Sequence, residues 1–220
     1  MKKCIIFDLD GTIISSEEII IKATQIFAER YLDKKLTYQQ CLKIVGVNTE
    51  NILRRIGIDE HEIHAFFPVF TGLLSEMSKE MQLFDGIEEL ITALHAKGYF
   101  LGIVTSRVQS EFDDAMERYD FSHYFDCVIV ADNTKNHKPH PEPIHLFMEK
   151  TGFSENDILY IGDSVNDYLA CKAAKTDFVL AEWGCIDDSS IQAPDFVAKQ
   201  PCDVFEILNI PNQDESALLS

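Results

Sequence analysis

The protein has 220 residues, of which 46% are hydrophobic and 25% charged, as in an ordinary globular chain. Thirty-seven Asp and Glu residues against 19 Lys and Arg give a formal net charge of -18, which argues against nucleic acids and anionic membranes as main partners because those need a basic surface. The length predicts one domain, or one domain with an insertion, that buries a full core without disulfides or metals.

The first predicted strand, residues 4–7, is separated from the next, residues 100–104, by a long gap. A parallel crossover needs only about a dozen residues, so the gap must hold an insertion. Capping-box patterns at Ser15–Glu18 and at Thr37–Gln40 each predict a helix start. Residues 60–80 read as a third helical region, interrupted at Pro68 and Gly72. We therefore expect residues 15–83 to form an all-helical cap.

Beyond the gap, short apolar runs alternate with helical patterns. Predicted strands lie at residues 100–104, 127–130, 158–161, 178–180 and 196–198, and predicted helices at 86–97, 110–119, 141–150, 165–174 and 203–208. Apolar strands that alternate with helices indicate a parallel sheet covered on both faces. The predicted fold class is α/β, with a Rossmann-like, doubly wound parallel sheet as core (residues 1–14 and 84–210), the helical cap (15–83) and a flexible tail (211–220).

The six cysteines are scattered, with no C-x-x-C pair, as expected for reduced thiols rather than a disulfide framework or zinc site. No stretch approaches the roughly 18 apolar residues that span a bilayer. We expect a soluble, cytoplasmic protein, either a monomer or a weak homodimer, that binds neither nucleic acid nor membrane.

Residues 8–12 read Asp-Leu-Asp-Gly-Thr and follow the first predicted strand. Ligands of open α/β sheets bind outside this carboxyl edge, and residues i and i+2 of a strand point the same way, so Asp8 and Asp10 are expected to share one space. Two such carboxylates need a cation or a shared proton between them. Gly11 allows a tight turn that brings backbone amides, with Thr12, close to a ligand. An Asx turn closing the strand explains the same residues without a ligand.

A second acidic pair, Asp163 and Asp167, follows the predicted strand 158–161. The four-residue spacing places both on one face if a helix starts at Ser164. Acidic residues at two strand ends suit Mg2+, which prefers oxygen ligands. A helix N-cap at Asp163 or Ser164 is the alternative.

Two further positions are weaker on their own. Thr105, Ser106 and Arg107 follow the strand 100–104 and precede a helix, where hydroxyls and free amides form either a phosphate site or an ordinary cap. Lys138 lies in a proline-rich loop and is either a compact positive charge for phosphate or a solvated side chain.

The order of these motifs resembles that of the haloacid dehalogenase-like superfamily, in particular its phosphoglycolate-phosphatase and β-phosphoglucomutase-like branch, with a helical cap inserted after the first motif. The resemblance implies that Asp8 is the nucleophile and Asp10 a general acid and base, whose pKa must be raised for it to be protonated at the first attack. It also implies that Thr105, Ser106, Arg107, Gly11 and Thr12 bind the substrate phosphate and that Lys138 neutralises charge. Mg2+ would be held by Asp8, Asp163, the backbone carbonyl of Asp10 and, in support, Asp167.

The predicted activity is a Mg2+-dependent phosphatase that hydrolyses a small phosphorylated metabolite through an aspartyl-phosphate on Asp8. Asp10 argues against dehalogenases, and Thr12 favours phosphatases over phosphomutases. A β-phosphoglucomutase-like sugar phosphomutase remains an alternative, and a non-enzymatic phospho-accepting or binding module is a remote one.

Substrate choice is expected to come from the cap. By resemblance, residues 45–48 face the substrate, and Arg54 and Arg55 either contact an anion or are a solvated pair. His61 and His64 lack the third ligand that a zinc site needs.

Overall fold

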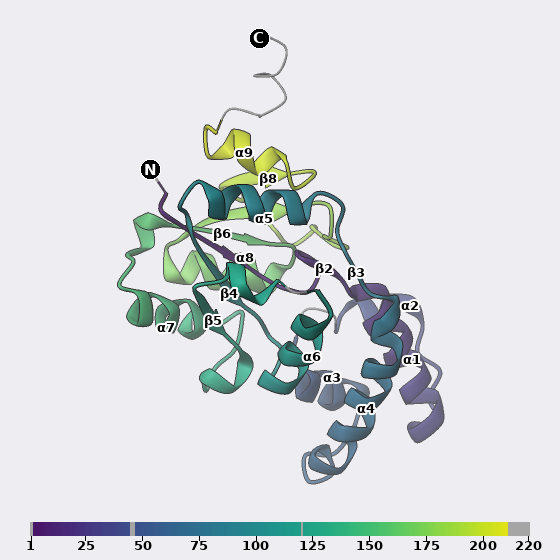
Figure 1. The fold of residues 1–220 in the computed structure, drawn as a ribbon. Helices are drawn as coiled ribbons and strands as arrows, with labels where there is room; N and C mark the ends of the chain where they lie inside the picture. Colours follow the sequence, from purple (N-terminus) through teal and green to yellow (C-terminus); the bar gives the residue numbers. More distant parts are fainter. Residues whose placement is uncertain (1, 45–46, 120, 211–220) are drawn as a thin grey trace.

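The computed structural model describes residues 2–44, 47–119 and 121–210. Its centre is a six-stranded sheet of order β5-β4-β1-β6-β7-β8, in which all neighbouring strands are parallel (Figure 1). The strands are β1 (Cys4–Phe7), β4 (Phe100–Val104), β5 (Cys127–Ile129), β6 (Ile158–Gly162), β7 (Asp177–Ala181) and β8 (Phe196–Ala198). The predicted tail, 211–220, lies outside the described residues.

Alternate side chains of each strand point to opposite faces of the sheet, and helices cover both faces. Ile5 and Phe7 of β1 pack into one apolar cluster, and Cys4 and Ile6 into another. The first cluster contains side chains of α5 (Ile87–Ala96), α6 (Gln109–Tyr119) and α9 (Asp203–Ile207), and the second those of α7 (Glu142–Thr151) and α8 (Val165–Ala174). The predicted doubly wound α/β fold is confirmed.

Strand ends differ from the predicted ones by a residue because ladder hydrogen bonds, not apolar character, set them. Asp177 belongs to β7 since it pairs in register with Leu159. Val130 lies outside β5, and its backbone N–H donates to the Asn133 side chain instead.

The inserted segment forms four helices, α1 (Glu17–Leu32), α2 (Tyr38–Leu42), α3 (Thr49–Ile56) and α4 (Ile63–Met77), here called the cap helices. Helices α1, α3 and α4 pack around Phe27 and Phe70, which are fully buried, and the cap helices lie to one side of the sheet (Figure 1). The chain passes between sheet and cap helices through β2 (Ile14–Ser15) and β3 (Gln82–Leu83), which pair antiparallel. Domain boundaries at 14/15 and 83/84 stay a prediction. None of the described helices is long and apolar enough to cross a bilayer.

Local expectations in the cap helices had mixed outcomes. The Thr37–Gln40 capping box is confirmed. The Ser15–Glu18 box is wrong: Ser15 lies in β2, and the N-cap of α1 is Ser16, whose hydroxyl donates to Asp10.

The predicted interruption at Pro68 and Gly72 is also wrong, since α4 runs unbroken through both. Proline inside a helix costs about 3 kcal/mol. Ile63 and Phe70 of the same helix are buried in the cap core, and this packing offsets the penalty.

Candidate active site

The carboxyl ends of β1, β4 and β6 place Asp8, Thr105 and Asp163 at one edge of the sheet, and all three residues are buried. Strands β4 and β5 lie on one side of β1, and the chain then crosses to the other side of β1, where β6 lies. Such a reversal of strand order is where open α/β sheets bind ligands. The N–H of Asp8 donates to the Ile161 carbonyl and that of Thr105 to the Ile129 carbonyl, so the strand ladder fixes both backbones.

Lys138 is the buried cation of this edge, with a side chain only 2% exposed. Its Nζ lies 2.8 Å from Asp8 Oδ1 and 2.6 Å from Asp167 Oδ1, and it also contacts the Tyr160 hydroxyl at 3.1 Å. Burial alone would lower the pKa of Lys138, but the charges of Asp167 and Asp8 outweigh it and raise the pKa. Lys138 is therefore a fixed positive charge beside Asp8.

Asp167 is fully buried and accepts hydrogen bonds from Lys138, from the Tyr160 hydroxyl at 2.9 Å and from Ser164. Ser164 is the N-cap of α8 in a capping box with Asp167, so the capping interpretation of Ser164 is confirmed, and Asp167 lies beside Lys138. Sequence reasoning missed Tyr160. The only sign of its role in the sequence is a hydroxyl group within an otherwise apolar strand. This sign is weak because tyrosine is common in strands.

Asp8, Asp163 and Asp167, here called the carboxylate cluster, each offer an oxygen, and these oxygens lie within 4.8 Å of one another. Burial and the charge of Asp167 raise the pKa of Asp8 to about 7. Burial and the charge of Glu17 raise that of Asp163 well above its usual value. Lys138 thus does not compensate all the negative charge, and the cluster offers the hard oxygen ligands that suit a divalent cation such as Mg2+.

Asp10 lies apart from this cluster. Arg107 Nε donates to Asp10 Oδ2 at 2.7 Å, its terminal nitrogen donates to Oδ1, and the Ser16 hydroxyl also donates to Oδ1. Burial alone would raise the pKa of Asp10, but the charge and hydrogen bonds of Arg107, together with Ser16, lower it. The expectation of a raised pKa at Asp10 is therefore wrong for this structure, because Arg107, predicted to bind substrate, holds the carboxylate ionised.

Glu17 is a second residue that sequence reasoning missed. It is buried at the start of α1, and burial, with the charge of Asp10, raises its pKa to about 8. Its carboxylate approaches Gly11 and Asp163 closely. An acidic residue in the first turn of a helix is ordinary, so the sequence carried no sign that Glu17 faces the site.

Thr12 links Asp163 of the carboxylate cluster to Trp183 through hydrogen bonds. Its hydroxyl donates to Asp163 Oδ1 at 3.2 Å, its carbonyl accepts from Trp183 Nε1 at 3.0 Å, and the residue is fully buried. Thr105 accepts the backbone N–H of Arg107 on its hydroxyl at 3.1 Å, which closes the turn after β4.

Gly11 has a φ of +75°, and a Cβ there would lie 2.1 Å from a Glu17 oxygen and 2.2 Å from an Asp163 oxygen. Gly152 has a similar φ of +79°, but its Cβ would meet no heavy atom within 4 Å. We expect Gly152→Ala to lower the free energy of unfolding by about 1 kcal/mol through backbone strain alone. Gly11→Ala should lower it clearly further, because overlap adds to strain. Urea denaturation measures both, and equal losses would contradict the crowding at Gly11.

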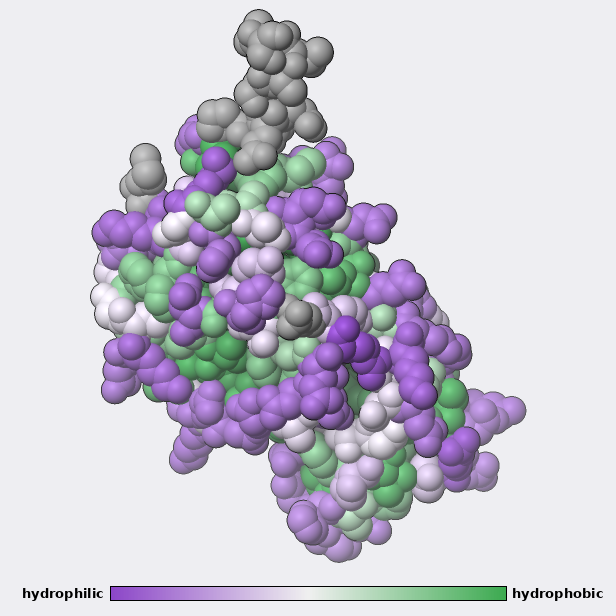
Figure 2. All heavy atoms as spheres, in the orientation of Figure 1, coloured by the Kyte–Doolittle hydropathy of each residue, from purple (hydrophilic) through white to green (hydrophobic). Residues whose placement is uncertain are grey.

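A cavity of about 330 Å3 opens between the cap helices and the core, and Asp8, Asp10, Ser106 and Arg107 contribute to its wall. In the surface view, hydrophobic residues are visible in the hollow where core and cap helices meet, framed by hydrophilic ones (Figure 2). Of the predicted substrate-facing segment 45–48, Val47 and Asn48 line the cavity, and residues 45–46 lie outside the described residues. The buried cluster thus borders a space between core and cap helices.

Residues 5–181 match the haloacid dehalogenase-like hydrolase family, which covers most of the chain. The chain belongs to this family. The resemblance inferred from the motifs is thereby confirmed, as is the expectation of an enzyme, a hydrolase of the haloacid dehalogenase-like family.

Relatives of this haloacid dehalogenase-like hydrolase match along nearly its whole length. Pyrophosphatase PpaX of Bacillus pumilus (strain SAFR-032) is 24% identical over 218 residues, covering 93% of this chain and 95% of that protein. The crystal structure of a candidate phosphoglycolate phosphatase from Lactobacillus plantarum is 29% identical, with a TM-score of 0.85, covering 94% of this chain and 100% of that one. A candidate β-phosphoglucomutase from Thermotoga maritima, 23% identical with a TM-score of 0.73 over 95% and 99% of the chains, shares the fold.

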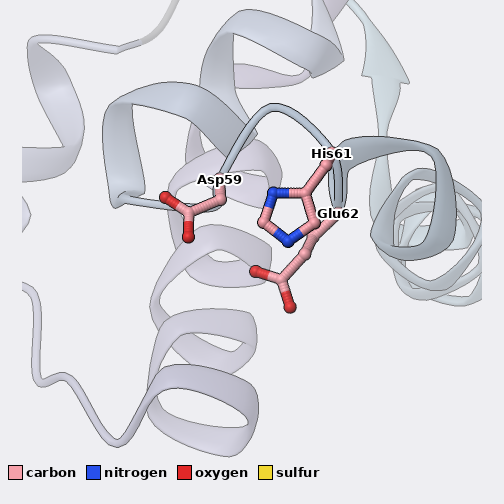
Figure 3. A group of neighbouring side chains, drawn as sticks. All are labelled: Asp59, His61 and Glu62. Carbon is pink, nitrogen blue, oxygen red and sulfur yellow. The ribbon is translucent and has the colours of Figure 1, made fainter.

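Two other groups of the cap helices lie away from the hydrolase site. Arg54 pairs with Glu60 and Glu50, and Arg55 donates to the Lys43 carbonyl, so neither guanidinium lines the cavity. This favours the solvated-pair interpretation over an anion contact. Asp59, His61 and Glu62 lie close together on an exposed turn before α4 (Figure 3). His64 is not part of that group, and exposed acidic neighbours of this kind are common without a metal.

Proposed function

We propose that the protein is a Mg2+-dependent phosphatase that hydrolyses a small phosphorylated metabolite through an aspartyl-phosphate on Asp8. The observation that carries the proposal is the placement of Asp8 at the wall of the cavity, with Lys138 Nζ 2.8 Å from its carboxylate and two further buried carboxylates beside it. The family supports a hydrolase, and the names of the relatives, a pyrophosphatase and a candidate phosphoglycolate phosphatase, support phosphate compounds as substrates.

In the first step an Asp8 oxygen attacks phosphorus, the bond from phosphorus to the leaving oxygen breaks, and Asp10 delivers a proton to that oxygen. In the second step Asp10 removes a proton from water, the water oxygen attacks phosphorus, and the bond to Asp8 breaks to release inorganic phosphate. Because an ionised Asp10 has no proton to give, its bond to Arg107 must open and its carboxylate must take up a proton from solvent before the first step. The guanidinium of Arg107, once released from Asp10, would then neutralise the substrate phosphate.

The remaining residues act on charge and position. Lys138 offsets the repulsion between the Asp8 carboxylate and an anionic phosphate, which is the main obstacle to the attack. Thr105 and Ser106 at the end of β4 and the Gly11 turn after β1 would hold the phosphate oxygens, while Thr12 positions Asp163. Asp8 and Asp163, with Asp167 and the Asp10 carbonyl, would hold Mg2+, which supplies charge neutralisation at the phosphate.

The test is release of inorganic phosphate from a panel of sugar phosphates, nucleotides, phosphoglycolate and pyrophosphate, each with Mg2+ and with excess EDTA. Metal-dependent release from at least one compound is expected. Accumulation of an isomerised sugar phosphate without free phosphate would point to the mutase instead. Absence of both, from folded protein, would contradict the proposal.

Mg2+ is expected to stabilise the protein even without substrate, because it relieves repulsion within the carboxylate cluster. At a hundredfold excess of Mg2+ over its Kd, the gain is about 2.7 kcal/mol, visible as a rise in Tm that EDTA reverses. Asp163→Asn should abolish most of the rise, while Asp59→Asn, which alters the exposed group before α4, should leave it intact. A Tm that rises equally in both variants would place the bound cation elsewhere.

The site is proposed to work in the cytoplasm, which agrees with six free cysteines. A monomer or weak homodimer fits the same proposal, since every group it uses comes from this chain.

A further inference from the structure

We infer that the substrate is a phosphate monoester of an uncharged, partly apolar alcohol of sugar-to-nucleoside size, whose alcohol part occupies the cavity between core and cap helices. This inference rests on the proposed phosphatase activity. It separates this chain from an enzyme built for pyrophosphate or phosphoglycolate, whose leaving groups are small anions.

The cavity is larger than a small leaving group needs. The cavity measures about 330 Å3. A cavity of about 150 Å3 holds a benzene molecule, and small-molecule sites begin at about 300 Å3. A phosphate or glycolate leaving group has only a few heavy atoms and would leave most of this space unfilled.

The wall of the cavity combines apolar side chains with hydroxyl groups. Apolar side chains reach it from both the cap helices and the core, among them Ile20 of α1, Ile52 of α3, Leu74 of α4 and Ala115 of α6. Ser75 and Ser110 add hydroxyls that can bond to those of an alcohol. Apolar walls with a few polar groups bind neutral ligands, because an anion would lose its hydration without gaining a partner.

The charged groups of the wall disfavour a second anionic group on the substrate. Among the described residues that line the cavity, the acids are Asp8, Asp10, Glu111 and Asp114, and the cations are Arg107 and Arg118. Arg107 donates two hydrogen bonds to Asp10 and one to the Glu111 carbonyl, and once released from Asp10 it would neutralise the phosphate that reacts, not a second anionic group. Arg118 is exposed, so solvent screens its charge. A second anionic group would therefore face more negative than positive charge, whereas an uncharged alcohol has no such penalty.

Gly72 offers a way to change the cavity without disturbing the chemistry. It lies on α4 in the cavity wall, and a Cβ there would meet no heavy atom within 4 Å. A larger side chain can therefore extend into the space. Val69, on the same helix, is exposed and does not line the cavity, so Val69→Leu is the matched control.

The first experiment compares kcat/KM for glucose 6-phosphate and uridine 5′-monophosphate with that for phosphoglycolate and pyrophosphate, with p-nitrophenyl phosphate as a general reporter. At least one of the two neutral-alcohol esters is expected to exceed both anionic compounds by about tenfold or more. A smaller ratio would overturn the inference, and so would a preference for an anionic compound that Arg118→Ala abolishes. In either case, Asp8-dependent phosphate release from p-nitrophenyl phosphate would still support the phosphatase activity. Absence of Asp8-dependent release from every compound would overturn both.

The second experiment uses Gly72→Leu. Filling the cavity should lower kcat/KM for the preferred neutral-alcohol ester by about tenfold or more, and that for pyrophosphate by less than about threefold. Val69→Leu should change neither by more than about twofold. An equal loss for both substrates in folded Gly72→Leu, or no loss for either, would overturn the inference. If Gly72→Leu does not fold, Ser75→Leu on the same wall carries the same expectation.

Discussion

Replacing Asp8 with Asn is expected to lower kcat by about 10³-fold or more with every substrate, because a neutral amide does not attack phosphorus. The substitution keeps the shape of the side chain and removes one charge from a crowded group of carboxylates. The folded protein should therefore be at least as stable as the wild type. Phosphate release measures the first effect and thermal unfolding the second.

A control variant separates loss of the nucleophile from loss of the acid. Asp10→Asn should also lower kcat, by about 10²–10⁴-fold, but it leaves Asp8 able to attack. With p-nitrophenyl phosphate, whose leaving group needs no proton, this variant should accumulate protein that carries one phosphoryl group, detectable by intact mass. Asp8→Asn should never show that mass. Phosphorylated Asp8→Asn, or turnover close to the wild type, would contradict the covalent mechanism at Asp8.

The core of the fold was open to prediction because each strand is an apolar run that both faces of the sheet bury. Cys4–Phe7 and Phe100–Val104 are buried or nearly so at every position, so hydrophobicity alone marks them. The motifs could then be placed at one edge, since parallel strands end together. Asp8, Thr105 and Asp163 meet there for that reason.

Within the site, sequence reasoning failed where a side chain's partner comes from a distant part of the chain. The pairing of Asp10 with Arg107 joins the loops after β1 and β4, and nothing local distinguishes an arginine that binds substrate from one that binds a carboxylate. From the sequence, Glu17 is an ordinary acidic residue in the first turn of α1. In the structure, its carboxylate lies next to Gly11 and so faces the site. Both cases depend on how the turn after β1 folds back, which is a tertiary property.

The cap helices illustrate the same limit for local structure. Pro68 and Gly72 are valid signals of a helix break, and tertiary packing of Ile63 and Phe70 overrides them. The start of α1 shows the opposite case. Ser16 occupies the N-cap, but its hydroxyl donates a hydrogen bond to Asp10 and does not cap the helix. A residue type that usually caps a helix therefore contacts a site residue here.

Replacing Lys138 with Met is expected to have the largest combined effect on stability and activity. The side chain is 2% exposed and lies between Asp8 and Asp167, so its removal leaves two buried carboxylates without their cation. Breaking a buried ion pair in this way costs about 3–5 kcal/mol. Because the same ammonium offsets the repulsion between Asp8 and phosphate, kcat should fall by about 10³-fold as well. Urea denaturation and phosphate release measure the two losses.

The double variant Lys138→Met with Asp167→Asn separates the two roles of the lysine. Removing the Asp167 charge relieves part of the repulsion that Lys138→Met creates, so the double variant should be more stable than Lys138→Met alone. Its kcat should nevertheless stay low, because Asp8 and the phosphate still lack the cation. If activity returned together with stability, Lys138 would act only by holding the fold. If Lys138→Met unfolded at the same urea concentration as the wild type, the buried ion pairs would contribute nothing to stability, and Lys138 would not be needed to offset the charges of Asp8 and Asp167.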